Sequence, residues 1–313
     1  MNLERLLTEK RNPDTKNIDM LSTLEIVSAI QREDEKVAAA VKMTLPDVAA
    51  AVELIVDALK RGGRLFYLGA GTSGRLGVLD AAECPPTFST EPELVQAIIA
   101  GGNAAMFQAV EGAEDDSQQA RLDLQSRGLK PQDAVVGLSA SGRTPYVIGG
   151  LRYAKQIGAV SLAVVCVPDA EMAADAQITM AALVGPEVIA GSTRMKAGTA
   201  QKMLLNMLST ATMVRLGKTY GNLMVDVRAT NAKLTARVQR MVKDVTGASE
   251  QEVAIALEQA AGSAKTAIVM LLGRCSAQQS VQLLAQAHGS VRHALLQAGL
   301  PRQHGLERMT DER

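Results

Sequence analysis

Three hydroxylated residues occupy one short turn of the sequence, Ser139–Thr144, directly after an apolar run. Ser139, Ser141 and Thr144 carry the hydroxyls, and Pro145 follows. Threonine before proline is typical of a helix N-cap and the first helical residue. The backbone N–H groups at such a helix start have no intrahelical partner, and the helix dipole favours an anion there. The turn therefore predicts a binding site for a phosphate group.

A second turn of similar composition, Gly69–Gly74, follows an earlier apolar run and contains Thr72 and Ser73. Glycines between a strand and a helix often serve backbone geometry alone, so this turn by itself is a weak signal. Two such turns are more informative, because parallel sheets bind ligands at the carboxyl ends of their strands. We expect both turns to lie at that edge of one sheet.

Short apolar runs alternate with helical patterns through the middle of the chain, which predicts a three-layer α/β sandwich around a parallel sheet. A helical pattern over residues 45–61 comes first. The expected strands are residues 64–68, 94–99, 133–138, 159–167 and 178–183. The expected helices between them are residues 76–84, 117–126 and 146–157, and the first should stop at Pro85-Pro86 because proline interrupts a helix.

Beyond about residue 225 the strand-like runs end and helical patterns take over. These patterns cover residues 234–245, 250–260, 264–272 and 288–298. Ser249 and Glu252 form an S-x-x-E capping box at the start of the second pattern. The sequence thus predicts four parts, which are an N-terminal helical segment (1–54), an α/β domain (55–225), a small helical module (226–300) and a loose tail (301–313).

The charge balance argues against a nucleic-acid-binding protein. The chain has 33 basic and 33 acidic residues, whereas nucleic-acid binders normally present a basic surface. It has no Trp, three Phe and four Tyr, so few side chains are available to stack on bases. We expect no nucleic-acid partner.

The cysteines predict neither a disulfide framework nor a zinc site, because Cys84, Cys166 and Cys275 are far apart and odd in number. Cys84 is better interpreted as a buried thiol than as a nucleophile, since no histidine precedes His288. Residues 1–30 lack a basic start followed by an apolar run, and no segment is apolar for long enough to cross a bilayer. We expect a soluble cytoplasmic protein with no membrane partner.

The two hydroxyl-rich turns, together with the segment 187–196 (EVIAGSTRMK), resemble the sugar isomerase domain that binds phosphosugars. That resemblance spans roughly residues 55–220 and implies a flavodoxin-like arrangement of the parallel sheet. A more specific resemblance, extending to about residue 299, is to N-acetylmuramic acid 6-phosphate etherases. It rests on residues 69–75, 80–88 (DAAECPPTF), 111–115 (EGAED), 191–202 and, near the N-terminus, 7–9 and 12–15. Residues 246–272 resemble a three-helix, ubiquitin-associated-type module.

The resemblance implies a reaction in which N-acetylmuramate 6-phosphate and water give N-acetylglucosamine 6-phosphate and D-lactate, as a step in recycling cell-wall amino sugars. If the sugar opens to its aldehyde, the C2 proton becomes acidic, and a general base and a general acid suffice to eliminate the lactyl group from C3. Water then adds at C3. This chemistry requires no metal and no other cofactor. The family also implies a homodimer with sites near the subunit boundary.

The catalytic carboxylates implied by the resemblance are Glu83 and Glu114. Glu83 comes just before Pro85-Pro86, and we expect it to end a helix, where the dipole disfavours negative charge and raises the carboxyl pKa. It is therefore assigned as the acid for the leaving group, and Glu114 as the partner for C2 proton transfer. Without the resemblance, a residue such as Glu83 is more often a solvated helix residue, and Glu114 more often part of an acidic helix start.

The implied substrate- and phosphate-binding residues are drawn from the two turns and the 187–196 segment. They are Thr72, Ser73, Ser139, Ser141, Thr144, Glu187, Ser192 and Lys196. For Glu187, Ser192 and Lys196, structural support and ligand contact remain equally consistent with the sequence. Two other functions also remain open, a non-catalytic phosphosugar sensor and an aldose–ketose isomerase, which shares phosphate binding and C2 deprotonation.

Overall fold

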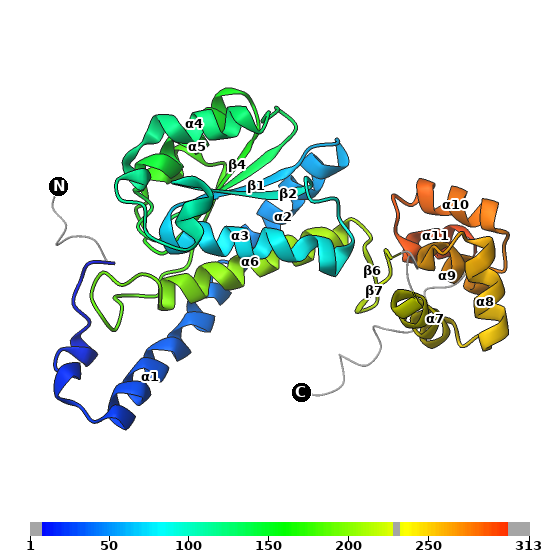
Figure 1. The fold of residues 1–313 in the computed structure, drawn as a ribbon, viewed down its shortest axis with the longest axis horizontal. Coiled ribbons are helices and arrows are strands. Elements are labelled where there is room, and N and C mark those ends of the chain that lie inside the picture. Colours follow the sequence, from blue (N-terminus) through cyan, green and yellow to red (C-terminus); the bar gives the residue numbers. More distant parts are fainter. Residues whose placement is uncertain (1–7, 228–231, 300–313) are drawn as a thin grey trace. The chain divides into compact units, whose positions relative to one another are not determined.

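The computed structural model describes residues 8–227 and 232–299, which belong to two compact units (Figure 1). The first unit comprises Met1–Pro86 and Thr90–Thr212, and the second Thr87–Ser89 and Met213–Arg313. The helical unit therefore begins earlier along the chain than the boundary near residue 225 drawn from the sequence. The expected loose tail, 301–313, lies outside the described residues.

A five-stranded parallel sheet forms the centre of the first unit. Its strands are β1 (Leu65–Gly69), β2 (Val95–Ile99), β3 (Ala134–Leu138), β4 (Val160–Val165) and β5 (Ile178–Ala181). The spatial order β2-β1-β3-β4-β5 is the flavodoxin-like order that the family resemblance implied. The chain changes direction across the sheet between β1 and β3, where Gly69 pairs with Leu138. Both hydroxyl-rich turns start at this switch point.

Helices cover both faces of the sheet, as expected for a parallel sheet (Figure 1). On one face lie α4 (Ser117–Ser126) and α5 (Pro145–Gln156), which pack in one apolar cluster with Phe66 and Leu68 of β1. On the other face lie α2 (Leu45–Lys60), α3 (Gly71–Phe88) and α6 (Lys196–Arg215). The predicted three-layer sandwich is thus confirmed.

A long helix, α1 (Thr23–Lys42), precedes this sandwich and follows two 3-10 turns, η2 (Pro13–Thr15) and η3 (Ile18–Met20). It begins with a capping box, in which Ser22 and Glu25 satisfy each other's backbone N–H groups. Further 3-10 turns lie in the connections: η4 (Gly102–Met106), η5 (Ala113–Asp115) and η6 (Glu171–Asp175).

The expected end of a helix at Pro85-Pro86 is wrong, because α3 continues to Phe88 with both prolines inside it. A proline inside a helix removes the hydrogen bond to the carbonyl four residues earlier. For Pro86 that carbonyl belongs to Ala82, an exposed residue. Glu83 therefore lies inside α3 rather than at its end.

The second unit contains a short hairpin and five described helices. The hairpin strands are β6 (Thr219–Tyr220) and β7 (Leu223–Met224), and the helices are α7 (Ala232–Thr246), α8 (Glu250–Gln259), α9 (Ala264–Gly273), α10 (Ala277–Gln286) and α11 (Val291–Gln297). The predicted capping box of Ser249 and Glu252 is confirmed at α8. The sequence reading missed α10, and it started the last helix too early, because His288 and Gly289 have positive φ and precede α11.

None of the helices described in either unit is long and apolar enough to cross a membrane.

Candidate functional site

The turn after β3 gathers its three hydroxyls, as the sequence predicted. Ser139 Oγ lies 2.8 Å from Thr144 Oγ1 and 3.4 Å from Ser141 Oγ. The backbone N–H of Gly142 also donates to Ser139 Oγ, at 3.0 Å. Gly142 has a φ of +66°, and a Cβ there would lie 2.4 Å from the Cβ of Ala170, so the turn requires glycine at this position. The result is a compact ring of hydroxyl groups at the carboxyl edge of the sheet.

Thr144 stands at the N-cap position of α5 with Pro145 after it, but its hydroxyl does not cap the helix. The hydroxyl contacts Ser139 instead, so the Thr144 side chain accepts no hydrogen bond from the first backbone N–H groups of α5. Those amides point out of the helix start and favour an acceptor of negative charge. The hydroxyl ring and the start of α5 together form a suitable anion site.

Thr72 and Ser73 lie in the first turn of α3, directly after the β1 loop. Because Gly69 pairs with Leu138, this loop and the Ser139–Thr144 turn leave the sheet side by side. Ser73 Oγ donates a 2.8 Å hydrogen bond to Oε1 of Gln201 on α6. One turn earlier on α6, a Cβ at Gly198 would lie 3.5 Å from Thr72 Cγ2, so the start of α6 packs directly against this loop.

Glu187 is 1% exposed and holds the start of α6. Its two carboxylate oxygens accept from the backbone N–H groups of Lys196 and Ala197, both at 3.0 Å. Burial raises the pKa of this carboxyl above its usual value, although the two amides oppose the increase. Its carboxylate oxygens thus serve as the cap of α6.

Lys196 is equally buried, at 1% exposed, and its ammonium pairs with the carboxylate of Glu33 on α1. Glu33 also bonds to Lys36, one turn further along α1. Burial acts to raise the pKa of Glu33, but the hydrogen bonds from Lys196 and Lys36 outweigh it and lower that pKa overall. Lys196 therefore ties α1 to the start of α6.

Further contacts from the N-terminal segment hold the residues that precede α6. Asn12 donates to the carbonyl of Pro186 and Thr15 to the carbonyl of Val188, while the N–H of Gly191 donates to the carbonyl of Thr8. Ser192 lies inside this tethered segment and is half-buried. For Glu187 and Lys196 the geometry favours structural support, the first of the two roles that the sequence left open.

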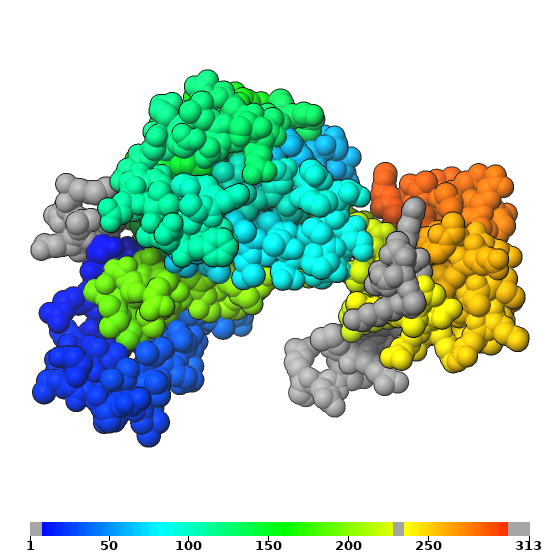
Figure 2. Space-filling view, in the orientation of Figure 1, coloured from blue at the N-terminus to red at the C-terminus, as the bar shows by residue number. Residues whose placement is uncertain are grey.

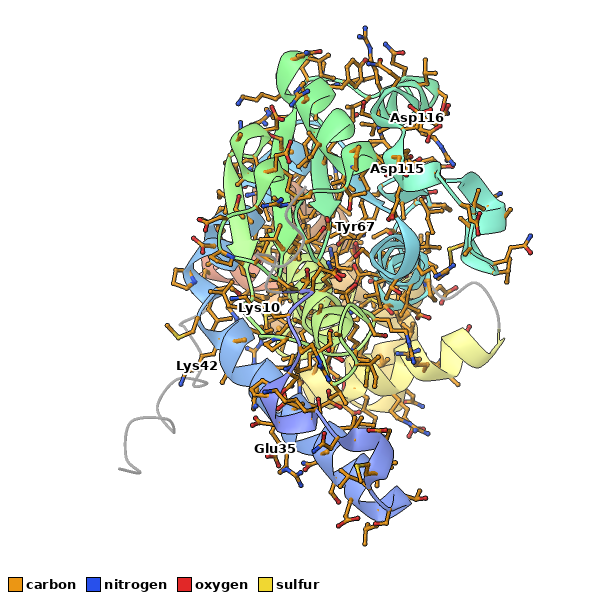
Figure 3. All side chains as sticks on the ribbon, turned by 90° about the vertical axis from the view of Figure 1, so that its left-hand side faces the viewer. Lys10, Glu35, Lys42, Tyr67, Asp115 and Asp116 are labelled. Carbon is orange, nitrogen blue, oxygen red and sulfur yellow. The ribbon has the colours of Figure 1, made fainter. Side chains whose placement is uncertain are left out.

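Glu114 lies in η5, within the connection from β2 to α4, and is exposed. Its neighbours Asp115 and Asp116 are at the surface in Figure 3. The connection leaves the carboxyl end of β2, and η5 packs against α5, whose start carries the hydroxyl ring. Glu114 therefore belongs to the same edge of the sheet as the anion site.

Arg75 on α3 is hydrogen-bonded to the connection that follows β2. Its guanidinium donates to the carbonyls of Met106 and Gln108, at 3.0 and 3.4 Å. Figure 2 shows α3 and the residues after β2 side by side on the surface of this unit. Both partners of the Arg75 guanidinium are thus carbonyls of the loop that follows β2.

Glu83 does not join the other candidates. It is exposed on α3, ten residues after Ser73, and a helix rises about 1.5 Å per residue. The carboxylate is thus ~15 Å along the helix from the anion site. The helix end that was expected to keep it protonated is also five residues away, at Phe88.

A buried polar cluster lies beside Glu83. Asp80 accepts hydrogen bonds from Tyr67, Asn206 and Ser209, at 2.9, 2.9 and 3.1 Å. Figure 3 shows Tyr67 inside the unit. Burial raises the pKa of Asp80 despite these donors. Burial, with Asp80 nearby, raises the pKa of Cys84 to about 12, so this thiol is inert at neutral pH, as the sequence suggested.

Within the described part of the chain, no three His, Cys, Asp or Glu side chains are placed to hold a metal ion. The residues that sequence reasoning missed are the supporting ones, Gln201 and Glu33. Each is a polar residue of a helix; Gln201 falls within the segment 191–202 that carries the resemblance, but no spacing marks either residue as buried.

Two family models match the chain. The glucokinase regulatory protein N-terminal SIS domain matches residues 47–155, and the SIS domain matches residues 109–211.

Among curated proteins, the chain is 56% identical to N-acetylmuramic acid 6-phosphate etherases from Yersinia pestis (strain Pestoides F) and from Yersinia pseudotuberculosis serotype IB (strain PB1/+). Each alignment runs over 295 residues and covers 94% of this chain and 100% of the relative.

Among solved structures, the chain is similar to a phosphoheptose isomerase from Francisella tularensis, with a TM-score of 0.48 and 16% identity over 62% of this chain and 100% of that one. A phosphoheptose isomerase from Neisseria gonorrhoeae gives a TM-score of 0.48 and 18% identity, over 61% and 98% of the two chains.

Proposed function

Because the chain belongs to the family of N-acetylmuramic acid 6-phosphate etherases, we propose that it converts N-acetylmuramate 6-phosphate and water into N-acetylglucosamine 6-phosphate and D-lactate. The observation that carries the proposal is identity of 56% along the whole length of the curated relatives. The anion site at the β1/β3 switch point supports it, because the substrate is a phosphate ester.

The 6-phosphate binds at the ring of hydroxyls formed by Ser139, Ser141 and Thr144, against the start of α5. Ser73 and Thr72 complete the site from the first turn of α3. Hydroxyl donors and free helix amides suit a phosphate, which offers only acceptor oxygens at neutral pH. This end of the substrate takes no part in bond breaking. Its role is to fix the sugar so that C2 and C3 face the catalytic carboxylates.

Glu114 removes the C2 proton of the open-chain aldehyde, and the electron pair forms an enolate. Collapse of the enolate breaks the bond between C3 and the lactyl oxygen, and an acid protonates that oxygen as D-lactate leaves. Water then adds to C3 of the unsaturated aldehyde and C2 is reprotonated, so the sum is one water consumed. The shared sheet edge of Glu114 and the hydroxyl ring supports this assignment.

Glu83 acts as the acid, and it enters the site from a second copy of the chain. Its ~15 Å separation along α3 from Ser73 exceeds the length of one hexose, so Glu83 of the same chain cannot reach C3 of a sugar anchored there. The carboxylate is exposed and free to enter a partner's site. An exposed apolar stripe on α1, with Leu24 74% and Val27 51% exposed, is consistent with a homodimer.

Mixed dimers test this arrangement. Glu83→Gln and Glu114→Gln variants are each expected to be inactive, whereas a mixed dimer has one site with both glutamates if Glu83 acts across the interface. Random mixing after co-expression then recovers about a quarter of the wild-type activity per dimer, since half the dimers are mixed and each has one intact site. If both glutamates act within one chain, no mixture recovers activity.

We assign the enzyme to the carbon–oxygen lyases, because the bond is broken by elimination. The free thiols Cys84 and Cys166, both buried, are consistent with a reducing compartment, and we propose the cytoplasm.

Purified protein incubated with N-acetylmuramate 6-phosphate tests the activity directly. We expect D-lactate to accumulate in a one-to-one ratio with N-acetylglucosamine 6-phosphate. Binding of the phosphosugar without release of lactate would refute the proposed reaction and favour a sensor. Formation of a ketose phosphate would favour an isomerase.

A further inference from the structure

A buried carboxamide lies behind the anion site and is only half satisfied. Gln201 on α6 is 1% exposed, and its Oε1 accepts the hydrogen bond from Ser73 Oγ. Its Nε2 is also buried and has no acceptor among the described residues. Buried amide donors without a partner are rare in folded proteins, so this group calls for an explanation.

The position of Gln201 is fixed by the surrounding structure. Glu187 holds the first amides of α6, and Gly198, one turn before Gln201, packs against Thr72. The carboxamide thus stands at a defined place behind Ser73. Because Nε2 is buried, a bound ligand does not contact it directly. Any effect of Gln201 on the ligand must pass through the Ser73 hydroxyl.

In this hydrogen bond the proton of the Ser73 hydroxyl is donated to Gln201 and is therefore not available to a bound anion. A serine has one proton to donate, and here that proton is donated to Gln201 Oε1. A phosphate oxygen accepts but does not donate, so Ser73 cannot bind it while its proton is used in this way.

We propose that Gln201 is a positioning residue that reverses the polarity of the Ser73 hydroxyl when the phosphosugar binds; this rests on the proposed function. The two ends of a carboxamide are nearly equal in size, so half a turn about its last bond exchanges them in the same space. Nε2 then donates to Ser73 Oγ, and Oε1 takes the place that Nε2 leaves, where an unpaired carbonyl oxygen is tolerated better than an unpaired N–H. The Ser73 proton is released to the phosphate oxygen.

Two substitutions separate this role from simple packing. In its ionised form Gln201→Glu offers only acceptors, so it keeps the Ser73 proton and adds a negative charge; because burial raises the pKa of a carboxyl, the comparison is made in alkaline solution. Gln201→Met fills the space but leaves the hydroxyl free to rotate toward the phosphate. We expect the KM for the phosphosugar to rise roughly 10–100-fold in Gln201→Glu, the loss of one hydrogen bond to a charged group, and only about threefold in Gln201→Met. The value of kcat should change less than KM in both.

The same substitutions in a Ser73→Ala background provide the control for charge. If Gln201 acts through Ser73, Gln201→Glu weakens binding of N-acetylglucosamine 6-phosphate by less than about threefold once the hydroxyl is gone. N-acetylglucosamine without the phosphate serves as the matched ligand and should be insensitive to all four variants. Thermal unfolding midpoints identify any variant that fails to fold.

A full effect of Gln201→Glu in the Ser73→Ala background would overturn the proposal, because charge alone would explain it. Equal effects of the Glu and Met substitutions would also overturn it, since they would indicate a packing role. Failure of the wild-type protein to bind N-acetylglucosamine 6-phosphate at all would refute the proposed function instead.

Discussion

The buried ion pair of Glu33 and Lys196 offers a direct test of whether Lys196 supports the fold or binds the ligand. The side chains of Glu33 and Lys196 are 4% and 1% exposed. Replacing one member of a buried pair leaves the other charge without a partner, which typically destabilises a protein by about 3–5 kcal/mol. We therefore expect Glu33→Gln to lower the free energy of unfolding by about that amount, because it removes the carboxylate that pairs with the buried Lys196 ammonium.

Replacing Lys196 should lower the free energy of unfolding by less than replacing Glu33. In Lys196→Met, Glu33 keeps its hydrogen bond with the half-exposed Lys36, so we expect a loss of about 1–3 kcal/mol. Combining Glu33→Gln with Lys196→Met removes both charges together and should return the stability to within about 1 kcal/mol of wild type. This double-mutant cycle isolates the energy of the pair from the effect of each substitution alone.

The pH dependence follows from the lowered pKa of Glu33. Its ordinary value is 4.5, and the folded value lies below it, so the stabilisation is fully present above pH 4.5 and is lost as pH falls through the folded pKa. The difference between wild type and Glu33→Gln should thus be constant from pH 5 to 8 and shrink in more acidic solution.

Urea unfolding followed by far-UV circular dichroism measures these free energies. Because the chain has two compact units, hydrogen exchange of peptides covering residues 23–42 and 186–199 assigns the loss to the first unit. One result refutes the reasoning. If Lys196→Met leaves stability and exchange unchanged but abolishes binding of the phosphosugar, Lys196 is a ligand contact and the ion pair does not hold the fold.

Three further predictions concern the site and its support. Ser141→Ala should weaken binding of N-acetylglucosamine 6-phosphate at least tenfold and that of N-acetylglucosamine hardly at all, as measured by calorimetry; equal effects would place the hydroxyl elsewhere. Tyr67→Phe should destabilise the protein by about 1–3 kcal/mol, because the Asp80 carboxylate loses a donor. Since burial already raises the Asp80 pKa, this loss should be largest when Asp80 is ionised and shrink as pH falls through that pKa; a pH-independent loss in urea titrations would contradict it. Iodoacetamide at pH 8 should modify the half-buried Cys275 well before Cys84, whose thiol has a pKa of about 12, and mass spectrometry of the labelled peptides checks the order.

The centre of the sheet could be predicted from the sequence because β1, β3 and β4 are buried on both faces. Such strands are continuous apolar runs, as in Ala134–Leu138, and the hydroxyl-rich turns that follow them mark the edge at which ligands bind. The turn Ser139–Thr144 has the predicted arrangement of hydroxyls. The local sequence was sufficient to predict this turn, because the three hydroxyl residues and the contacts between them all lie within six consecutive residues.

The supporting contacts could not be predicted, because they join residues far apart in the chain. The separation is 163 residues for Glu33 and Lys196, and 128 for Ser73 and Gln201. A polar residue of a helix gives no sign that a distant segment will bury it. The course of α3 through Pro85 and Pro86 was missed for a related reason, since the local rule that proline ends a helix takes no account of the structure around the helix.

The central claim, elimination of lactate followed by hydration of C3, is tested most directly by running the reaction in water labelled with oxygen-18 and, separately, in deuterium oxide. Elimination and hydration place the labelled oxygen on C3 of N-acetylglucosamine 6-phosphate and deuterium on C2, and leave lactate free of label. Labelled lactate with an unlabelled sugar would contradict the claim, because it would show that water attacks the lactyl carbon and that C2 and its proton take no part.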